Sequence, residues 1–104
     1  MDTFNAIASK RETAFAEAIF VLHTLSEAPS VSILDYLLEN GEATLLDLII
    51  TTGMDADTLD GQLDLLCQTK VVQLHSNLHS NWYQIDYQRL ERVSLVAGQL
   101  ASGK

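Results

Sequence analysis

Hydrophobic residues recur at three- and four-residue steps along most of this chain, and that spacing predicts a mainly helical fold. The first helical pattern covers 3–25, and its second half is apolar on more than one face. A helix that is apolar nearly all round has to be covered on both sides, so we expect one face on the core and another on a second subunit. Shorter helical patterns follow at 30–40, 44–51, 56–69 and 86–101.

Turn signals separate these helical patterns. Pro29 precedes Ser30, which we expect to be the N-cap of the second helix, and Gly41 is typical of a left-handed helix end. Gly53 predicts a tight turn, and Asp55 and Asp86 are expected to be helix N-caps. The residues expected to face inward from the short helices are Ile33, Leu34, Leu37, Leu38, Leu45, Leu48, Ile49, Leu59, Leu63, Leu66 and Cys67.

Two short segments, 71–74 and 82–85, predict the strands of a β-hairpin. The residues between them, 75–81, repeat His-Ser-Asn, and we expect them to form a polar hairpin tip. His75 and His79 raise the possibility of a metal site, but zinc requires three or four ligands and no cysteine or carboxylate is nearby in sequence. We therefore expect no metal there.

The composition favours one small acidic domain, 1–104, with a net charge of −8. Cys67 is the only cysteine, so no intramolecular disulfide can form, and we expect it to be a small buried residue in a reducing compartment. The first residues include Lys10 and Arg11 where a secretory signal would be apolar. No apolar stretch approaches the length of a membrane span. We therefore expect a soluble, cytoplasmic protein that does not interact with membranes.

Two short helices joined by a glycine turn, followed by a hairpin, form the pattern of a winged helix-turn-helix. The segments that carry it are Ile33-Leu34, Leu37-Leu38-Glu39-Asn40-Gly41-Glu42, Asp47-Leu48, Thr52-Gly53-Met54-Asp55, 58–66, Lys70-Val71-Val72 and Tyr83-Gln84-Ile85. In these segments the chain resembles the ArsR family of small dimeric bacterial repressors. The resemblance covers about residues 30–100, and the first helix is similar to the family's dimerisation helix.

The resemblance implies a homodimeric transcriptional regulator with helical dimerisation elements at both termini. These would be an N-terminal dimerisation helix, 1–26, and a C-terminal helix, 86–101, on either side of a winged helix-turn-helix, 30–85. A recognition helix at 55–69 and a wing at 75–81 would contact double-stranded DNA. The candidate DNA-binding residues are Thr58, Gln62, Gln68, Lys70, His75, Asn77, His79 and Asn81. The candidate dimer contacts are Phe4, Ile7, Phe15, Ile19, Leu90, Val93, Val96 and Leu100.

The chain departs from the family at positions that would face DNA. Asp60 stands where the family usually has serine, Gly61 where it often has arginine, and Asp64 where it often has lysine. The family's wing is rich in arginine, while this one has only histidines as latent cations. A helix that presents carboxylates to phosphates loses the electrostatic attraction that supplies most non-specific affinity.

The family's metal-sensing residues are also absent. Its sensing cysteines correspond to Thr44 and Leu46 here, and a second metal site would need histidines near Gln88 and Gln99. We therefore expect neither a cysteine-based metal sensor nor a bound cofactor. We expect no enzymatic activity either, because the sequence offers no nucleophile–base set, no glycine-rich phosphate loop and no metal constellation.

The charge pattern leaves two functions open. From Glu12 to Thr69 the chain has eleven carboxylates and no lysine or arginine. The family resemblance favours a regulator that binds a palindromic operator. The charge disfavours DNA binding and favours the alternative, an acidic winged-helix dimer that binds a basic protein or mimics DNA.

Overall fold

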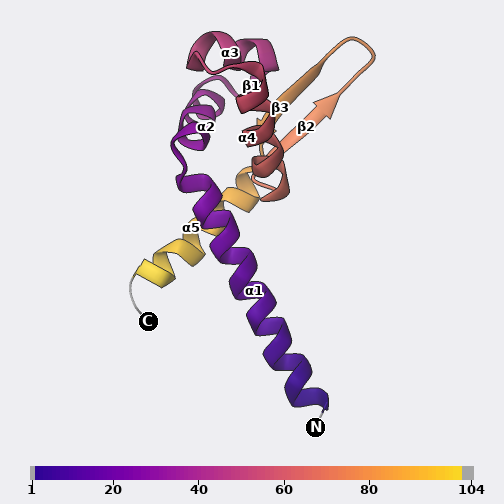
Figure 1. Cartoon of the computed structure of the whole chain (residues 1–104), viewed down its shortest axis with the longest axis vertical. Helices are drawn as coiled ribbons and strands as arrows, with labels where there is room; N and C mark the ends of the chain where they lie inside the picture. Colours follow the sequence, from indigo (N-terminus) through magenta and orange to yellow (C-terminus); the bar gives the residue numbers. More distant parts are fainter. Residues whose placement is uncertain (1, 102–104) are drawn as a thin grey trace.

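A computed structural model describes the backbone of residues 2–101 and the side chains of 13–98 (Figure 1). The chain forms five helices and a small sheet, in the order α1 (Asp2–Ser26), α2 (Ala28–Asn40), β1 (Glu42–Ala43), α3 (Leu45–Thr52), α4 (Ala56–Gln68), β2 (Val72–Ser76), β3 (Asn81–Ile85) and α5 (Tyr87–Ala101). The predicted fold class, mainly helical with a small β-hairpin, is confirmed.

The sheet has three antiparallel strands in the order β1-β3-β2. Strands β2 and β3 form the predicted hairpin, with Val72 opposite Ile85 and Ser76 opposite Asn81. The hairpin projects away from the helices, and β2 is its outer strand (Figure 1). Strand β1 was not predicted, because two residues are too few to show an alternating pattern.

The core lies between the three short helices and the base of the sheet. Most of the residues expected to face inward are fully buried, together with residues of all three strands: Ile33, Leu37, Leu48, Leu59, Leu63, Leu66, Ala43, Val72 and Ile85. Leu38 was expected inward and is 51% exposed, because the buried stripe of α2 runs through Ile33 and Leu37. Cys67 is half-buried at the edge of this core.

The turn signals between α2, α3 and α4 form as predicted. The backbone at Gly41 and Gly53 adopts φ values of 84° and 72°, which glycine reaches at little cost. Helix α3 begins with a capping box, in which the Thr44 hydroxyl accepts from the Asp47 N–H at 3.1 Å and the Asp47 carboxylate accepts from the Thr44 N–H at 3.0 Å. Asp55 caps α4 by accepting from the Thr58 N–H at 2.8 Å.

The expectation that Ser30 caps the second helix was wrong. Helix α2 starts at Ala28, so its N-cap, Glu27, lies three residues before Ser30, and Pro29 stands in the first turn, where a missing N–H costs nothing. Ser30 is fully buried inside the helix. Its hydroxyl accepts a hydrogen bond of 2.7 Å from the side-chain amide of Gln62 on α4, so the residue ties two helices together.

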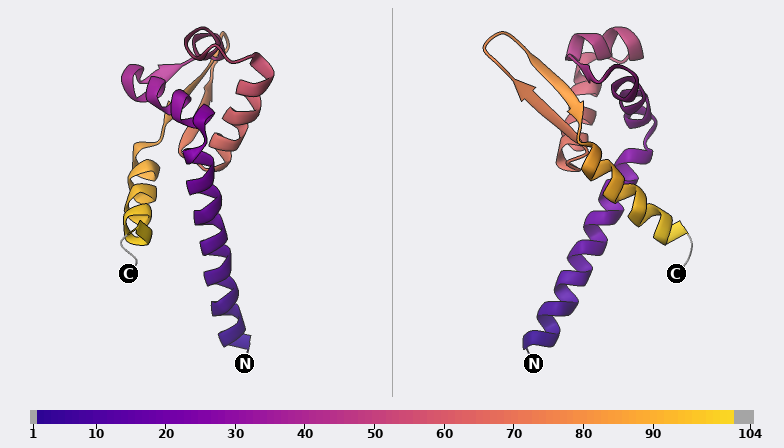
Figure 2. Two further views of the ribbon diagram at one scale, coloured as in Figure 1. Left: turned by 60° about the vertical axis from the view of Figure 1, so that its left-hand side comes forward. Right: turned by 180° about the vertical axis from the view of Figure 1, so that it is seen from behind.

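Helices α1 and α5 cross beside the core and extend beyond it on the side opposite the hairpin (Figure 2). A second buried cluster joins them through Val21 on α1, Val71 before β2 and Val93 on α5. Asp86 precedes α5 and accepts from the Arg89 N–H at 3.1 Å, as expected of an N-cap. No helix in the described part of the chain is long and apolar enough to cross a membrane.

We predict that Gln62→Ala destabilises the protein by about 1–3 kcal/mol, the cost of leaving the buried Ser30 hydroxyl without its donor. Urea unfolding followed by circular dichroism measures this change. Gln68→Ala is the matched control, because Gln68 is exposed on the same helix and should change the free energy of unfolding by less than about 0.5 kcal/mol. Equal effects of the two substitutions would contradict the role assigned to the Gln62–Ser30 bond.

Candidate nucleic-acid interface

Helix α4 follows α3 through the Gly53 turn and presents one polar face to solvent. The exposed residues of that face include Thr58, Asp60, Asp64 and Gln68. Leu59, Leu63 and Leu66 occupy the opposite face and are fully buried. Two of the predicted DNA-binding residues, Thr58 and Gln68, are thus accessible, and the two carboxylates lie among them.

Gln62 does not lie where it was expected. Its side chain is buried, with 9% of its surface exposed, and its amide donates to Ser30 Oγ at 2.7 Å and to Glu27 Oε1 at 3.4 Å. The sequence alone does not show whether a glutamine among the leucines of α4 is buried or exposed. Gln62 therefore does not belong to the accessible surface of α4.

The hairpin tip is a tight loop over 77–80. Asn77 shapes it, since its side-chain oxygen accepts from the N–H groups of His79 and Ser80, each at 2.8 Å, and its own N–H donates to Ser80 O at 2.9 Å. Leu78 is 97% exposed at this tip, although the tip was predicted to be polar. His79 and Asn81 are also exposed. The tip therefore presents an apolar side chain and a histidine to any partner.

His75 belongs to the body of the hairpin and not to its tip. It lies in β2 opposite Trp82, and the two rings stack with centroids 5.8 Å apart and planes 15° apart. Its Nε2 is buried and meets no hydrogen-bond partner within the described residues. Because the ring packs on Trp82, it is less accessible than a residue of a free loop.

Lys70 is the one cation between α2 and β3, and its backbone is unusual. It is exposed and has a φ of 67°, the only positive φ of a non-glycine residue in the part of the chain that the structure describes. A side chain in this left-handed region costs about 1–3 kcal/mol, which glycine would avoid. The backbone at Lys70 is therefore strained, and this strain is the cost of having a lysine instead of a glycine at this exposed position.

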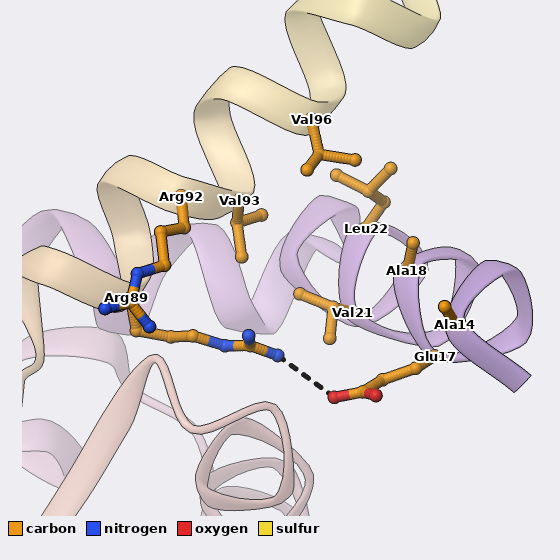
Figure 3. Close-up of a pocket in the computed structure, with 9 residues that line it drawn as sticks. All are labelled: Ala14, Glu17, Ala18, Val21, Leu22, Arg89, Arg92, Val93 and Val96. Atoms are coloured by element: carbon orange, nitrogen blue, oxygen red, sulfur yellow. Dashed lines mark hydrogen bonds and ion pairs between the residues drawn. The ribbon is translucent and has the colours of Figure 1, made fainter. Parts of the chain in front are cut away.

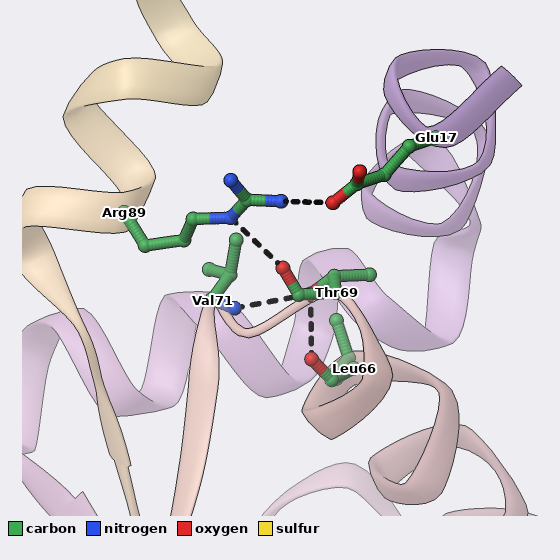
Figure 4. Close-up of polar contacts among 5 residues, drawn as sticks. All are labelled: Glu17, Leu66, Thr69, Val71 and Arg89. Carbon is green, nitrogen blue, oxygen red and sulfur yellow. Dashed lines mark hydrogen bonds and ion pairs between the residues drawn. The ribbon is translucent and has the colours of Figure 1, made fainter. Parts of the chain in front are cut away.

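Arg89 is held inside the protomer (Figure 4). Its Nε donates to the Thr69 carbonyl oxygen at 3.0 Å, and its Nη2 forms an ion pair with Glu17 of α1 at 3.3 Å. Arg92 lies one turn further along α5, beside α1 (Figure 3). Neither arginine is therefore available near α4 to offset its carboxylates.

A groove of about 640 Å³ is lined by residues of α4 and β2. Asp60, Asp64 and Asp86 contribute three carboxylates to its lining, against the single ammonium group of Lys70. The phenol of Tyr83 also lines it. Burial raises the pKa of Tyr83, and the negative groups of Cys67, Asp60 and Asp64 raise it further. The groove is acidic.

The faces of α1 and α5 that point away from the core carry exposed apolar side chains. Phe15 is 60% exposed, Ile19 48% and Val96 39%. A groove of about 200 Å³ runs between the two helices, and Figure 3 shows Val96 beside Leu22 there. Three other predicted dimer contacts have side chains outside the described ones, namely Phe4, Ile7 and Leu100.

The two remaining predicted dimer contacts lie elsewhere than expected. Val93 is 9% exposed and packs against Val21 and Val71, and Leu90 packs against both buried clusters. Both residues face the interior of the protomer, because the α5 stripe has to cover α1 of its own chain first.

No group of three or more histidine, cysteine, aspartate or glutamate residues is placed to hold a metal ion in the described part of the structure. The position of one absent family cysteine, Thr44, is used as the N-cap of α3. The position of the other, Leu46, is 63% exposed.

Neither a protein-family model nor a curated protein sequence matches the chain. Solved structures do. The repressor BigR from Xylella fastidiosa superposes with a TM-score of 0.62 and 24% identity, over 88% of this chain and 91% of that one. The homodimeric winged helix-turn-helix domain of Mb0332 from Mycobacterium bovis, a possible ArsR-family regulator, gives 0.72 and 21% over 90% and 85%. NolR from Sinorhizobium fredii gives 0.69 and 18% over 89% of each chain.

The chain has the winged helix-turn-helix fold. At these identities the likeness establishes the fold, and it confirms the resemblance to ArsR-type regulators at that level. The β2–β3 hairpin is the wing of this fold, and α3 and α4 form its helix-turn-helix. The unpredicted strand β1 completes the wing sheet by pairing with β3.

We predict that Cys67 reacts slowly with iodoacetamide at pH 8. Burial raises the pKa of its thiol, and the nearby carboxylate of Asp64 raises it further, so little of the reactive thiolate is present. The reaction should accelerate as the pH rises toward the thiol pKa, and Asp64→Asn should accelerate it at fixed pH. Mass spectrometry of the alkylated protein gives the rate, and the urea-unfolded protein is the reference. A native rate equal to the unfolded one would contradict this assignment.

Proposed function

We propose that this protein is a homodimeric transcriptional regulator of the ArsR type that binds double-stranded DNA through α4 and the wing. The observation that carries this proposal is the pairing of an exposed α4 face with a projecting hairpin in a fold shared with transcriptional repressors (Figure 1). In such folds the second helix of the helix-turn-helix enters the major groove. A two-fold dimer would place two such helices on a palindromic operator. We place this activity in the cytoplasm.

The proposed DNA contacts come from α4, from Lys70 and from the wing. Thr58 and Gln68 on α4 are exposed and could hydrogen-bond to base edges. Lys70 contacts a phosphate, and the strain of its backbone supports a role for its charge. The polar residues of the wing would follow the adjacent backbone or minor groove, namely His75, Asn77, His79 and Asn81. Gln62 is excluded from this set because its amide is already bonded to Ser30.

We propose that the dimer forms through the outer faces of α1 and α5. Phe15 and Ile19 lie one helical turn apart on α1, and both are about half exposed, at 60% and 48%. Val96 contributes from α5. Exposed apolar residues gathered on two crossing helices are typical of a surface that a second subunit covers. The homodimeric neighbour Mb0332 supports this assembly.

A second function is favoured by the charge. Residues 28–85, which contain the helix-turn-helix and the wing, carry eight carboxylates and a single lysine. DNA affinity depends on cations that displace counterions from phosphates, and this surface has almost none. In the alternative the same dimer binds a basic protein, either as an interaction module or as a mimic of DNA. In neither function does the protein sense metal through cysteines or catalyse a reaction.

A salt series separates the two functions. Fluorescence anisotropy of a labelled random-sequence DNA duplex should show binding at low ionic strength, with an affinity that falls steeply as salt increases. That result supports the regulator. No binding at any salt concentration, to random sequence or to a selected library of duplexes, would leave the protein-binding function.

We predict that Asp60→Ser together with Asp64→Lys strengthens DNA binding and steepens its salt dependence. The double variant removes two carboxylates from the exposed face of α4 and adds one cation, so more counterions are displaced. Asp35→Ser with Glu39→Lys is the matched control, because these exposed carboxylates lie four residues apart on α2 and the charge change is the same. If both variants gained affinity equally, α4 would not face the DNA.

We predict that Phe15→Glu or Val96→Glu shifts the protein from dimer to monomer. A buried, unpaired carboxylate at an apolar interface costs more free energy than the contact supplies. Sedimentation velocity at micromolar concentration measures the shift. Ile50→Glu is the control, since Ile50 is 73% exposed on α3, away from both helices. A wild-type protein that sediments as a monomer, or a dimer unaffected by both changes, would contradict the interface.

A further inference from the structure

Strand β2 has one side without a partner strand. In the sheet order β1-β3-β2 it is an edge strand, and no other strand lies beside its outer side in Figure 1. Natural edge strands are usually protected from pairing with another chain by lysine, proline or a bulge. Residues 72–76 contain no lysine or proline, and their register with β3 is continuous. This edge is unprotected.

The register shows which backbone groups face the open side. Val71 O accepts from Asp86 N at 2.8 Å, and Asn77 N donates to Ser80 O at 2.9 Å, so both ends of the ladder are hydrogen-bonded pairs. Bonded and non-bonded pairs alternate along an antiparallel ladder. The backbone N–H and C=O groups of the residues between, Val72, Leu74 and Ser76, therefore point away from β3. Val72 is buried, so only the groups of Leu74 and Ser76 are accessible. Within the described chain no hydrogen bond reaches them.

The acidic groove beside α4 runs along this edge. Four consecutive residues of β2, 72–75, line it. Side chains alternate between the two faces of a strand, so a groove lined by four in a row follows the strand's edge. Its apolar lining includes Leu63 of α4 and Tyr83 of β3. The groove thus offers unpaired backbone groups beside an apolar surface.

The charged side chains that line the groove determine which kind of partner it can bind. Asp60 and Asp64 stand on the α4 side, and Asp86 and Lys70 lie near the base of the hairpin. Three carboxylates against one ammonium group repel phosphate and attract arginine or lysine. A nucleic acid also has no N–H and C=O pattern that could continue a β-sheet. A polypeptide strand has that pattern.

We propose that the groove between α4 and β2 binds an extended basic segment of a partner protein, which pairs with β2 as a fourth strand and places its arginine or lysine side chains against Asp60 and Asp64. Main-chain hydrogen bonds to residues 74 and 76, which are exposed, supply affinity, and the carboxylates supply the preference for basic residues. This docking does not depend on DNA binding. DNA titration tests the regulator, and a peptide titration without DNA tests the groove.

The experiment is a titration of the ¹⁵N-labelled full-length protein with a capped nine-residue peptide of alternating arginine and threonine. We expect the amide resonances of Leu74 and Ser76 to shift more than those of Gln73 and His75, because only the former point toward the added strand. Two control peptides are matched in length. One has glutamate in place of arginine, and the other keeps arginine but is N-methylated at alternate backbone amides, which removes its strand donors.

The protein variant for this test is Asp60→Asn with Asp64→Asn, which keeps the size of both side chains. It should weaken peptide binding by about two- to fivefold per carboxylate at low salt. Asp35→Asn with Glu39→Gln on α2 is the control, because it removes the same charge from an exposed helix pair that does not line the groove.

Alternating shifts along β2 that are lost with the N-methylated peptide and weakened by the α4 variant alone would establish the docking site. Three results would each overturn the proposal. The first is the absence of any shift at millimolar peptide, and the second is equal binding of the N-methylated peptide. The third is equal weakening by the α2 control, which would mean that the peptide responds only to net charge.

Discussion

The burial of one face of α4 is the constraint on which the rest of the structure depends. Leu59, Leu63 and Leu66 are removed from water against α2, α3 and the sheet. A helix with 3.6 residues per turn cannot bury these positions without turning the intervening ones outward. The Gln62–Ser30 hydrogen bond fixes the same rotation, because a slip of the helix would leave a buried hydroxyl and amide unpaired. The outward direction of Asp60 and Asp64 follows from this packing.

The rotation of α4 places two carboxylates on the face that the fold leaves exposed. The chain shares the winged helix-turn-helix fold with the repressor BigR, yet the exposed face of α4 is anionic. The arginine nearest to it, Arg89, is used inside the protomer to join α5 to the Thr69 carbonyl and to Glu17 (Figure 4). A cation bound in this way contributes to docking α1 and α5 and does not neutralise phosphate. The fold and the surface chemistry therefore support different partners.

The elements that the sequence predicted were those with local causes. Gly53 and Asp55 end one helix and begin the next by backbone conformation and capping, and both act within a few residues. The hairpin was predicted because two short strand-like segments, 71–74 and 82–85, flank a polar His-Ser-Asn repeat. Strand β1 was missed because Glu42 and Ala43 acquire their strand geometry only by pairing with Gln84 and Tyr83 of β3, which lie far along the chain. The packing of Val93 into its own protomer likewise depends on where α1 lies.

By itself, then, the sequence determined the order of the elements, their turns and the acidic character of the surface between α2 and the wing, because these follow from periodicity, capping and composition. Only the tertiary structure decided which polar residues remain accessible. Gln62 and Ser30 look like surface residues in the sequence, and each is buried because the other satisfies it across two helices. The open edge of β2 beside the α4 carboxylates was decided in the same way, since it exists only once helix and strand lie next to each other.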